Sequence, residues 1–195
     1  MLYTVVGDNM YDDILKLVDE ITNYIEIKDY EIPDIDLYMD QVTSFMDKKL
    51  SSFKRNEDDL ILSKTMINNY AKNKVIPPPN KKKYSKKHMM ILIWVYHLKQ
   101  TLSINDIGKL MGFLGREEDN INYIEMYNNF LDIQKKSSNN LKANFDDMLH
   151  SIESTNSNFD GNEKLFLLVL ELILSANIQK RLAEKIIDNY FNNSK

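Results

Sequence analysis

Apolar side chains recur at intervals of three and four residues along most of the chain, which is the spacing of an amphipathic helix. The first such stretch lies within residues 1–30, where Asp8 or Asn9 can cap a helix. Its apolar positions are Ile14, Leu17, Val18, Ile21 and Ile25. Pro33 then interrupts the pattern, and a second helix is predicted from Leu37 to about Phe53.

Three serines mark expected helix starts in the middle of the chain, because a serine hydroxyl can accept a hydrogen bond from the first helical turn. They are Ser63 before a short helix over 64–72, Ser85 before a longer helix, and Ser103 before a short helix over 104–111. After the 64–72 helix, Pro77–Pro78–Pro79 favours a stiff, extended path that leads into the sequence KKKY.

Residues 117–195 predict a further group of helices. The expected helices are 117–136, 139–152, 162–175 and 179–191, with an exposed loop over 151–158. Five glycines and four prolines leave little turn material for a β-rich fold, so the predicted class is all-α. The chain then divides into an N-terminal amphipathic helix (1–30), a central domain (31–115) and a helical dimerisation or regulatory domain (116–195).

Charge is distributed unevenly, although the formal net charge is only -4. Residues 61–111 contain ten lysines and a single acidic residue, Asp106, whereas residues 1–60 have a net charge of -9. Solvated helical faces usually mix both signs, so a lysine-rich surface without a ligand is the lesser alternative. The block predicts a positive patch that faces a polyanion.

Several kinds of chemistry have no support in the residues. The chain has no cysteine, which excludes disulfides, thiolate zinc sites and a cysteine nucleophile. His88 and His97 are nine residues apart on one helix and do not share a ligand face. Residues 156–161 resemble the start of a calcium loop, but Leu167 takes the place of its bidentate Glu, so a turn with a helix cap is expected. We therefore predict that the protein is not an enzyme and holds no metal or cofactor.

The N-terminal segment does not have the pattern of a signal peptide, because it lacks a basic start and a long apolar core. The longest apolar stretch, 165–174, is about half of what a membrane span requires. A soluble, cytoplasmic protein without a membrane partner is expected.

The order of elements in residues 37–111 is that of a winged helix-turn-helix: a helix, a short turn, a short helix with a polar outer face, a basic loop and a longer helix. The outward residues of the 64–72 helix are Lys64, Thr65, Asn68, Asn69 and Lys72. Those of the loop and of the next helix are Lys81, Lys82, Lys83, Lys86 and Lys87. Asparagine can bind an adenine edge, threonine either base class, and lysine phosphate or guanine. The alternative is a polar helix face that touches only water.

The sequence SKTMINNYAKNKVIPPPNKKKYS, residues 63–85, resembles the DNA-binding head of the mercury-resistance-regulator (MerR) superfamily. In this chain Ser63 takes the place of the superfamily's helix cap, Ile67 that of its core Leu, and Tyr70 that of its second Tyr. Val75–Ile76 corresponds to the Leu-Leu pair. Tyr84–Ser85 corresponds to the opening of the third helix, and residues 103–111 correspond to the last short helix. The resemblance implies a winged helix-turn-helix that binds DNA. The superfamily's Arg-Tyr-Tyr-Glu is Asn-Asn-Tyr-Ala here, so the bases that are read do not carry over.

A closer resemblance, over about residues 31–135, is to a bacterial family of domains of unknown function. Its members share the stretch LYMDQV and the run PPPxKKKY, which here are residues 37–42 and 77–84.

These observations predict a sequence-specific DNA-binding transcriptional regulator, with double-stranded DNA as its partner. The stretch 117–136 has more apolar residues than one face of a monomeric helix needs, so homodimerisation through it and the helices after it is expected. The sequence identifies no small-molecule effector. The alternative function is a protein-interaction adaptor, in which the acidic first sixty residues dock on the basic block and mask it.

Overall fold

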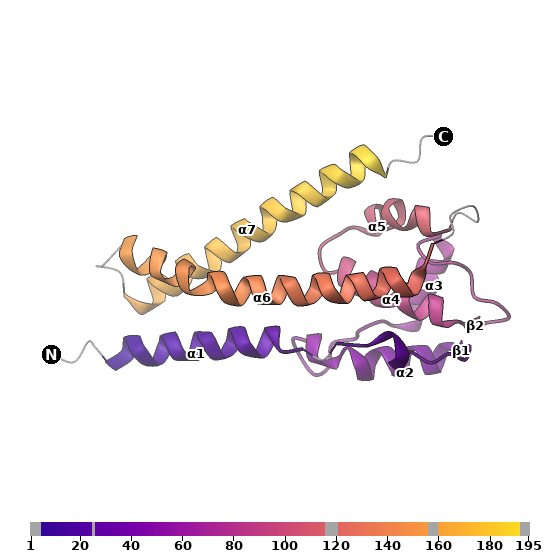
Figure 1. Cartoon of the computed structure of the whole chain (residues 1–195), viewed down its shortest axis with the longest axis horizontal. Helices are drawn as coiled ribbons and strands as arrows, with labels where there is room; N and C mark the ends of the chain where they lie inside the picture. The colour runs from indigo at the N-terminus through magenta and orange to yellow at the C-terminus, as the bar shows by residue number, and fades with distance from the viewer. Residues whose placement is uncertain (1–4, 25, 116–120, 156–159, 192–195) are drawn as a thin grey trace. The chain divides into compact units, whose positions relative to one another are not determined.

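The computed structural model describes residues 5–24, 26–115, 121–155 and 160–191, which are mostly helical (Figure 1). Seven α-helices and one two-stranded sheet lie in these ranges. The predicted all-α class is confirmed at this level, because each strand contains only two residues. No helix in the same ranges is apolar over a length that would cross a bilayer.

The chain divides into two compact units. The central unit combines residues 25–131 with 180–195, and the helical unit combines residues 1–24 with 132–179. Helices α6 (Tyr123–Thr155) and α7 (Gly161–Tyr190) each contribute to both units. The division of the chain at residues 30 and 115 stays a prediction, because compactness does not decide which parts act alone.

The central unit is built around α4 (Lys86–Leu98), in which every residue from His88 to Tyr96 is buried. A helix that is apolar on all sides needs neighbours on all sides. The surrounding elements are β1 (Leu37–Tyr38), α2 (Met39–Lys49), η2 (Ser51–Phe53), α3 (Lys64–Lys72), β2 (Lys83–Tyr84), α5 (Ile104–Met111), η3 (Gly112–Gly115) and the start of α6. Ile27 and Ile32, on either side of η1 (Asp29–Glu31), also belong to this core. From α6, Tyr127 is fully buried and donates a 2.8 Å hydrogen bond to the Ile27 carbonyl.

Three predicted helix starts are confirmed, since α3, α4 and α5 begin directly after Ser63, Ser85 and Ser103. The predicted 37–53 helix is too long at both ends. Leu37 and Tyr38 instead form β1, which pairs with β2 through Leu37–Tyr84 and Tyr38–Lys83. Helical spacing in the sequence cannot reveal this pairing, because the partner strand lies far along the chain.

The four helices expected after residue 117 are two long ones, α6 and α7. Polar residues near 137–140 do not break α6: the Ser138 hydroxyl donates to the Gln134 carbonyl, one turn back in the same helix, at 3.2 Å. The predicted loop over 151–158 is wrong for residues 151–155, which are helical, and residues 156–158 lie outside the described residues. Asp160 caps α7, as expected, by accepting the N–H groups of Asn162 and Glu163 at 2.9 and 3.0 Å.

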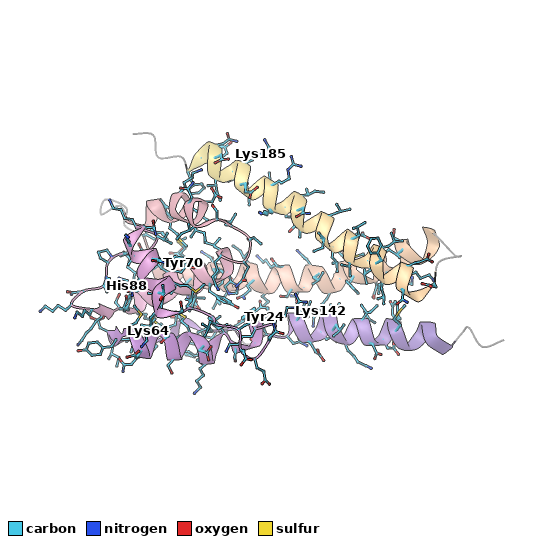
Figure 2. The ribbon with its side chains drawn as sticks, turned by 180° about the vertical axis from the view of Figure 1, so that it is seen from behind. Tyr24, Lys64, Tyr70, His88, Lys142 and Lys185 are labelled. Carbon is cyan, nitrogen blue, oxygen red and sulfur yellow. The ribbon has the colours of Figure 1, made fainter. Side chains whose placement is uncertain are left out.

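The helical unit has a small core of its own. It comprises Val18 of α1 (Val5–Thr22), Phe145, Leu149 and Ile152 of α6, and Leu168 of α7. Lys142 of α6 holds α1 through an ion pair with Asp19 at 2.8 Å (Figure 2). Helix α1 begins before Asp8 and Asn9, so neither is its cap. Two of its predicted inward positions, Leu17 and Ile21, are exposed by 58% and 67% because this core is narrow.

Candidate nucleic-acid interface

Helix α3 has one buried side and one polar, exposed side. The Ser63 hydroxyl accepts the Met66 N–H at 3.1 Å and so fixes the first turn. Ile67 and Tyr70 then reach the core. The structure places all five predicted contact residues of this helix on the exposed side: Lys64, Thr65, Asn68, Asn69 and Lys72. Burial of Ile67 and Tyr70 therefore sets the rotation of the helix that presents them.

The C-terminus of α3 has a feature that the sequence did not single out. The Val75 N–H donates to the Tyr70 carbonyl at 2.9 Å, and the Lys74 N–H donates to the Ala71 carbonyl at 3.2 Å. This pair of bonds is the Schellman motif, whose left-handed position is usually glycine. Here Lys74 occupies it with φ 56° and is exposed. In the sequence, the only indication of this feature is that a lysine follows the predicted helix end, where glycine is the usual residue.

The basic loop ends in a tight hairpin rather than an irregular coil. Asn80 and Lys83 exchange two backbone hydrogen bonds, at 3.1 and 2.9 Å. The two residues between them, Lys81 and Lys82, have φ values of 48° and 65°, the pattern of a type I′ turn. Such turns favour Asn-Gly, because both residues need a left-handed backbone. The hairpin thus places two exposed lysines at its tip.

The base of the hairpin is fixed to the core through His88. Its Nδ1 atom accepts the Ser85 N–H at 3.1 Å, and its ring packs edge-on against Tyr84 with centroids 5.7 Å apart. Burial lowers the pKa of His88, an effect opposed by the nearby carbonyls of Pro77 and Pro78. The imidazole therefore stays neutral at pH 7 and has a structural role at the start of α4.

The predicted phosphate-binding lysines differ in their surroundings. Lys86 forms a 2.8 Å ion pair with Asp34, and Lys64 forms an ion pair with Asp40 (Figure 2). Lys83 lies 5.1 Å from the centre of the Tyr38 ring, and Lys87 lies 4.1 Å from that of Tyr123. Among the described residues, no ion pair involves Lys72, Lys81 or Lys82. The hairpin tip and the end of α3 therefore present lysines that have no acidic partner in the described part of the chain.

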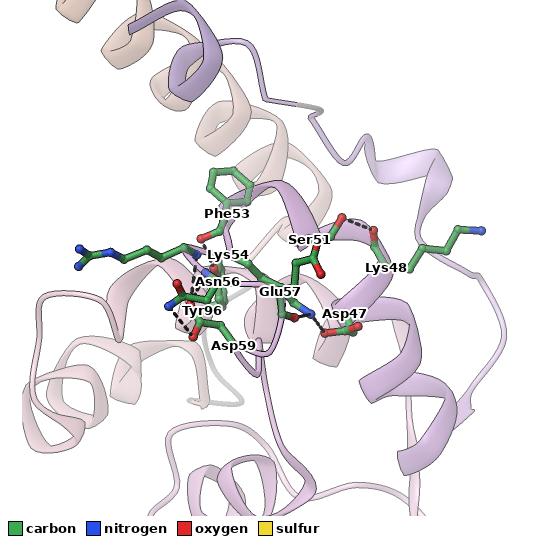
Figure 3. Close-up of polar contacts among 10 residues, drawn as sticks. Asp47, Lys48, Ser51, Phe53, Lys54, Asn56, Glu57, Asp59 and Tyr96 are labelled. Atoms are coloured by element: carbon green, nitrogen blue, oxygen red, sulfur yellow. Dashed lines mark hydrogen bonds and ion pairs between the residues drawn. The ribbon is translucent and has the colours of Figure 1, made fainter. Parts of the chain in front are cut away.

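The connection between α2 and α3 corrects one prediction. A short turn was expected, but residues 50–63 separate the two helices, whereas a helix-turn-helix turn has about three or four residues. The connection is held together by local bonds (Figure 3). Lys54 pairs with Asp47 at 2.7 Å, and the Asp59 carboxylate accepts the N–H groups of Asn56 and Arg55 at 2.9 and 3.1 Å. The N–H groups of Asn56 and Arg55 lower the pKa of the Asp59 carboxyl, and the Asn56 N–H has the largest effect.

The part of the chain that contains α3 and the hairpin matches a known protein family. The family model described as Domain of unknown function (DUF1836) matches residues 27–130, which is more than half of the chain. The chain belongs to the DUF1836 family. The DUF1836 match starts and ends within two residues of the 25–131 part of the central unit, so α3 and the hairpin lie inside it. No curated protein matches the chain significantly, and no solved structure does.

Proposed function

We propose that the DUF1836 domain of this chain is a MerR-like winged helix-turn-helix that binds double-stranded DNA in transcriptional regulation. Helix α3 enters the major groove, and the hairpin over 77–84 contacts phosphates. The order β1–α2–α3–β2–α4–α5 supports this assignment, with β2 leading from the hairpin into α4, whereas the connection over 50–63 departs from the short turn of a helix-turn-helix. Helix α2 touches α3, β1 and β2, so the reading helix and the hairpin flank one scaffold helix.

One observation carries the proposal. In the described part of the chain, every residue other than glycine with a positive φ is a lysine of the basic block: Lys74, Lys81 and Lys82. A left-handed backbone costs an L-residue about 1–2 kcal/mol, and glycine avoids this cost. Strained residues of this kind cluster at functional sites. In this chain a lysine occupies three positions where backbone geometry alone favours glycine, which is expected if its charge binds an anion.

The division of labour follows from the exposed groups. Asn68 and Asn69 can each bind an adenine edge through the side-chain amide, and Thr65 can contact either base class. The hairpin lysines bind phosphates, release counterions and supply affinity without sequence preference. When DNA binds, Lys64 and Lys86 each leave an exposed carboxylate and contact a phosphate instead. The loss of these ion pairs costs little free energy, because a surface ion pair contributes only about 0–1 kcal/mol.

A second candidate function rests on those two ion pairs. Asp34 and Asp40 belong to the acidic first sixty residues and contact Lys86 and Lys64 of the basic block. This contact favours the adaptor alternative, in which the acidic segment masks the block and DNA is not the ligand. The exposed Lys72, Lys74, Lys81 and Lys82 favour DNA, because they have no such acidic partner among the described residues.

Selection of binding sites from randomised duplex DNA tests the proposal, followed by affinity measurements on the enriched sequence. Asn68→Ala and Asn69→Ala should weaken specific binding by about 1–3 kcal/mol for whichever amide binds a base, with little change in non-specific binding. Their effect on stability should stay within about 0.5 kcal/mol, because both side chains are exposed. Asn128→Ala and Asn129→Ala, on an exposed part of α6, are matched controls. Failure to enrich any sequence, or unchanged binding by both α3 variants, would refute groove reading by α3.

A further inference from the structure

The small sheet formed by β1 and β2 has one buried face and one exposed face. Leu37 and Tyr84 lie opposite each other in the register, and both are buried. The next opposed pair is Tyr38 and Lys83, which points to the other face because neighbouring residues of a strand alternate. Tyr38 is exposed by 55%. A phenol ring and an ammonium group therefore lie side by side on the surface at the base of the hairpin.

Lys83 is held in place by the Tyr38 ring. Its Nζ atom lies 5.1 Å from the ring centre, where the face of the ring attracts a cation. No ion pair involves Lys83 in the part of the chain that the structure describes. The charge is therefore positioned without being neutralised. An anion that binds to it causes little further loss of side-chain freedom.

Tyr38 differs from most tyrosines of the central unit in its exposure. Four of the others contribute their rings to the core and are buried: Tyr70, Tyr84, Tyr96 and Tyr127. An exposed tyrosine combines a ring that can pack with an O–H group that can donate, which is why tyrosine is common in interfaces. Tyr38 thus adds a neutral donor beside the positive charge of Lys83.

The pair lies next to the proposed reading helix. Tyr38 is the residue directly before α2, and Asp40, in the first turn of α2, forms an ion pair with Lys64, the first residue of α3. Helix α2 contacts β1, β2 and α3, and these elements lie together in Figure 1. The charge of Asp40 is compensated by Lys64. A duplex that receives α3 in its major groove therefore brings its backbone close to Tyr38 and Lys83.

We propose that Tyr38 and Lys83 bind one DNA phosphate together. The Tyr38 hydroxyl donates a hydrogen bond to one phosphate oxygen, and the Lys83 ammonium contacts another. Both residue types are common phosphate donors in DNA complexes, and such contacts fix the register of the protein on the duplex. This inference rests on the proposed DNA binding and adds to it a binding residue outside both α3 and the basic block. Strand pairing sets the distance between the two donors.

Anisotropy titrations of the full-length protein with a random-sequence duplex at four or five salt concentrations test the pair, since phosphate contacts do not depend on base sequence. Tyr38→Phe keeps the ring against Lys83 and removes only the hydroxyl. It should weaken binding about tenfold, as expected for a hydrogen bond to a charged group. The slope of log K against log salt should stay unchanged, because a neutral donor releases no counterion. Lys83→Ala should instead weaken binding and flatten this slope by about 0.9.

Tyr30→Phe is the matched control, because Tyr30 is exposed by 78% in the same unit and should not contact DNA. Urea midpoints of both tyrosine variants should equal that of the wild type. The double variant Tyr38→Phe/Lys83→Ala should lose less affinity than the product of the two single losses, since both groups bind one phosphate.

Five results would overturn this inference while DNA binding itself stands. They are wild-type affinity of Tyr38→Phe, an equal loss in Tyr30→Phe, a salt slope altered by Tyr38→Phe, a lowered urea midpoint of Tyr38→Phe, and single losses that multiply in the double variant. A wild-type protein that binds no duplex would overturn the proposed function together with the phosphate pair.

Discussion

Replacing the two lysines at the hairpin tip by glycine should stabilise the protein and weaken its DNA binding together. Lys81 and Lys82 have φ values of 48° and 65°, where a side chain is unfavourable and glycine is not. The same side chains are exposed and have no ion pair among the described residues, so they are available for phosphate. Structure and function therefore favour different residues at these positions.

The expected gain in stability follows from two opposing terms. Relief of the left-handed backbone contributes about 1–2 kcal/mol at each position. The greater chain entropy of glycine in the unfolded state returns about 0.4–1 kcal/mol. The difference for Lys81→Gly/Lys82→Gly is a gain of about 0–3 kcal/mol in total with a midpoint of about 1.5 kcal/mol, which raises the melting temperature of a chain of this size by about 3–6 °C.

Alanine provides the matched control. Lys81→Ala/Lys82→Ala removes the same two charges but keeps a Cβ atom, so the backbone strain remains. Its stability should stay within about 0.5 kcal/mol of the wild type. For DNA binding, both double variants should flatten the slope of log K against log salt by about 1.8 per protomer, because two phosphate contacts are lost. Adding Lys83→Ala to either double variant should raise this change to about 2.7.

Urea unfolding and fluorescence anisotropy at four or five salt concentrations measure both effects. If glycine stabilises no more than alanine, the hairpin does not have the left-handed turn. If the salt slope is unchanged, the lysines do not contact phosphate and only improve solubility. Equal loss of specific and non-specific binding is expected, because phosphates carry no base information.

Three further predictions concern the central unit. Burial lowers the pKa of His97 to about 4, below its usual 6.5, so the unfolded chain binds a proton first and stability falls as the pH drops. Between pH 7 and pH 5 this loss should be about 1–2 kcal/mol, and urea titrations of His97→Phe should show it reduced. Tyr127→Phe leaves the buried Ile27 carbonyl without its 2.8 Å donor and should cost about 1–3 kcal/mol in the same assay. Ser63→Ala removes the α3 cap and should cost about 1 kcal/mol, whereas no loss would mean that the N-terminus of α3 is held by other contacts.

The candidate interface was predictable where its signals are local. Ser63 at the start of α3 and the burial of Ile67 and Tyr70 are properties of nine consecutive residues, and they place the five polar side chains outward. Lys74 was missed because its left-handed backbone depends on how α3 ends, not on its own side chain. The long connection over 50–63 was missed because its ordering comes from bonds such as Lys54–Asp47 that leave no periodic pattern.

What the sequence determined by itself is the helical class, the starts of α3 to α5, with side-chain caps from Ser63 and Ser103, and the concentration of positive charge in 61–111, all of which depend on neighbours within a few residues. Only the tertiary structure decided the rest. Strand pairing between Leu37 and Tyr84 joins residues far apart in the chain. The left-handed turn forms at Lys81 and Lys82, although lysine is not a residue that favours such a turn. The apolar stripes of α6 and α7 show which residues avoid water, but a stripe does not say which element covers it. Whether Leu174 or Leu168 is buried depends on the neighbours that tertiary packing supplies.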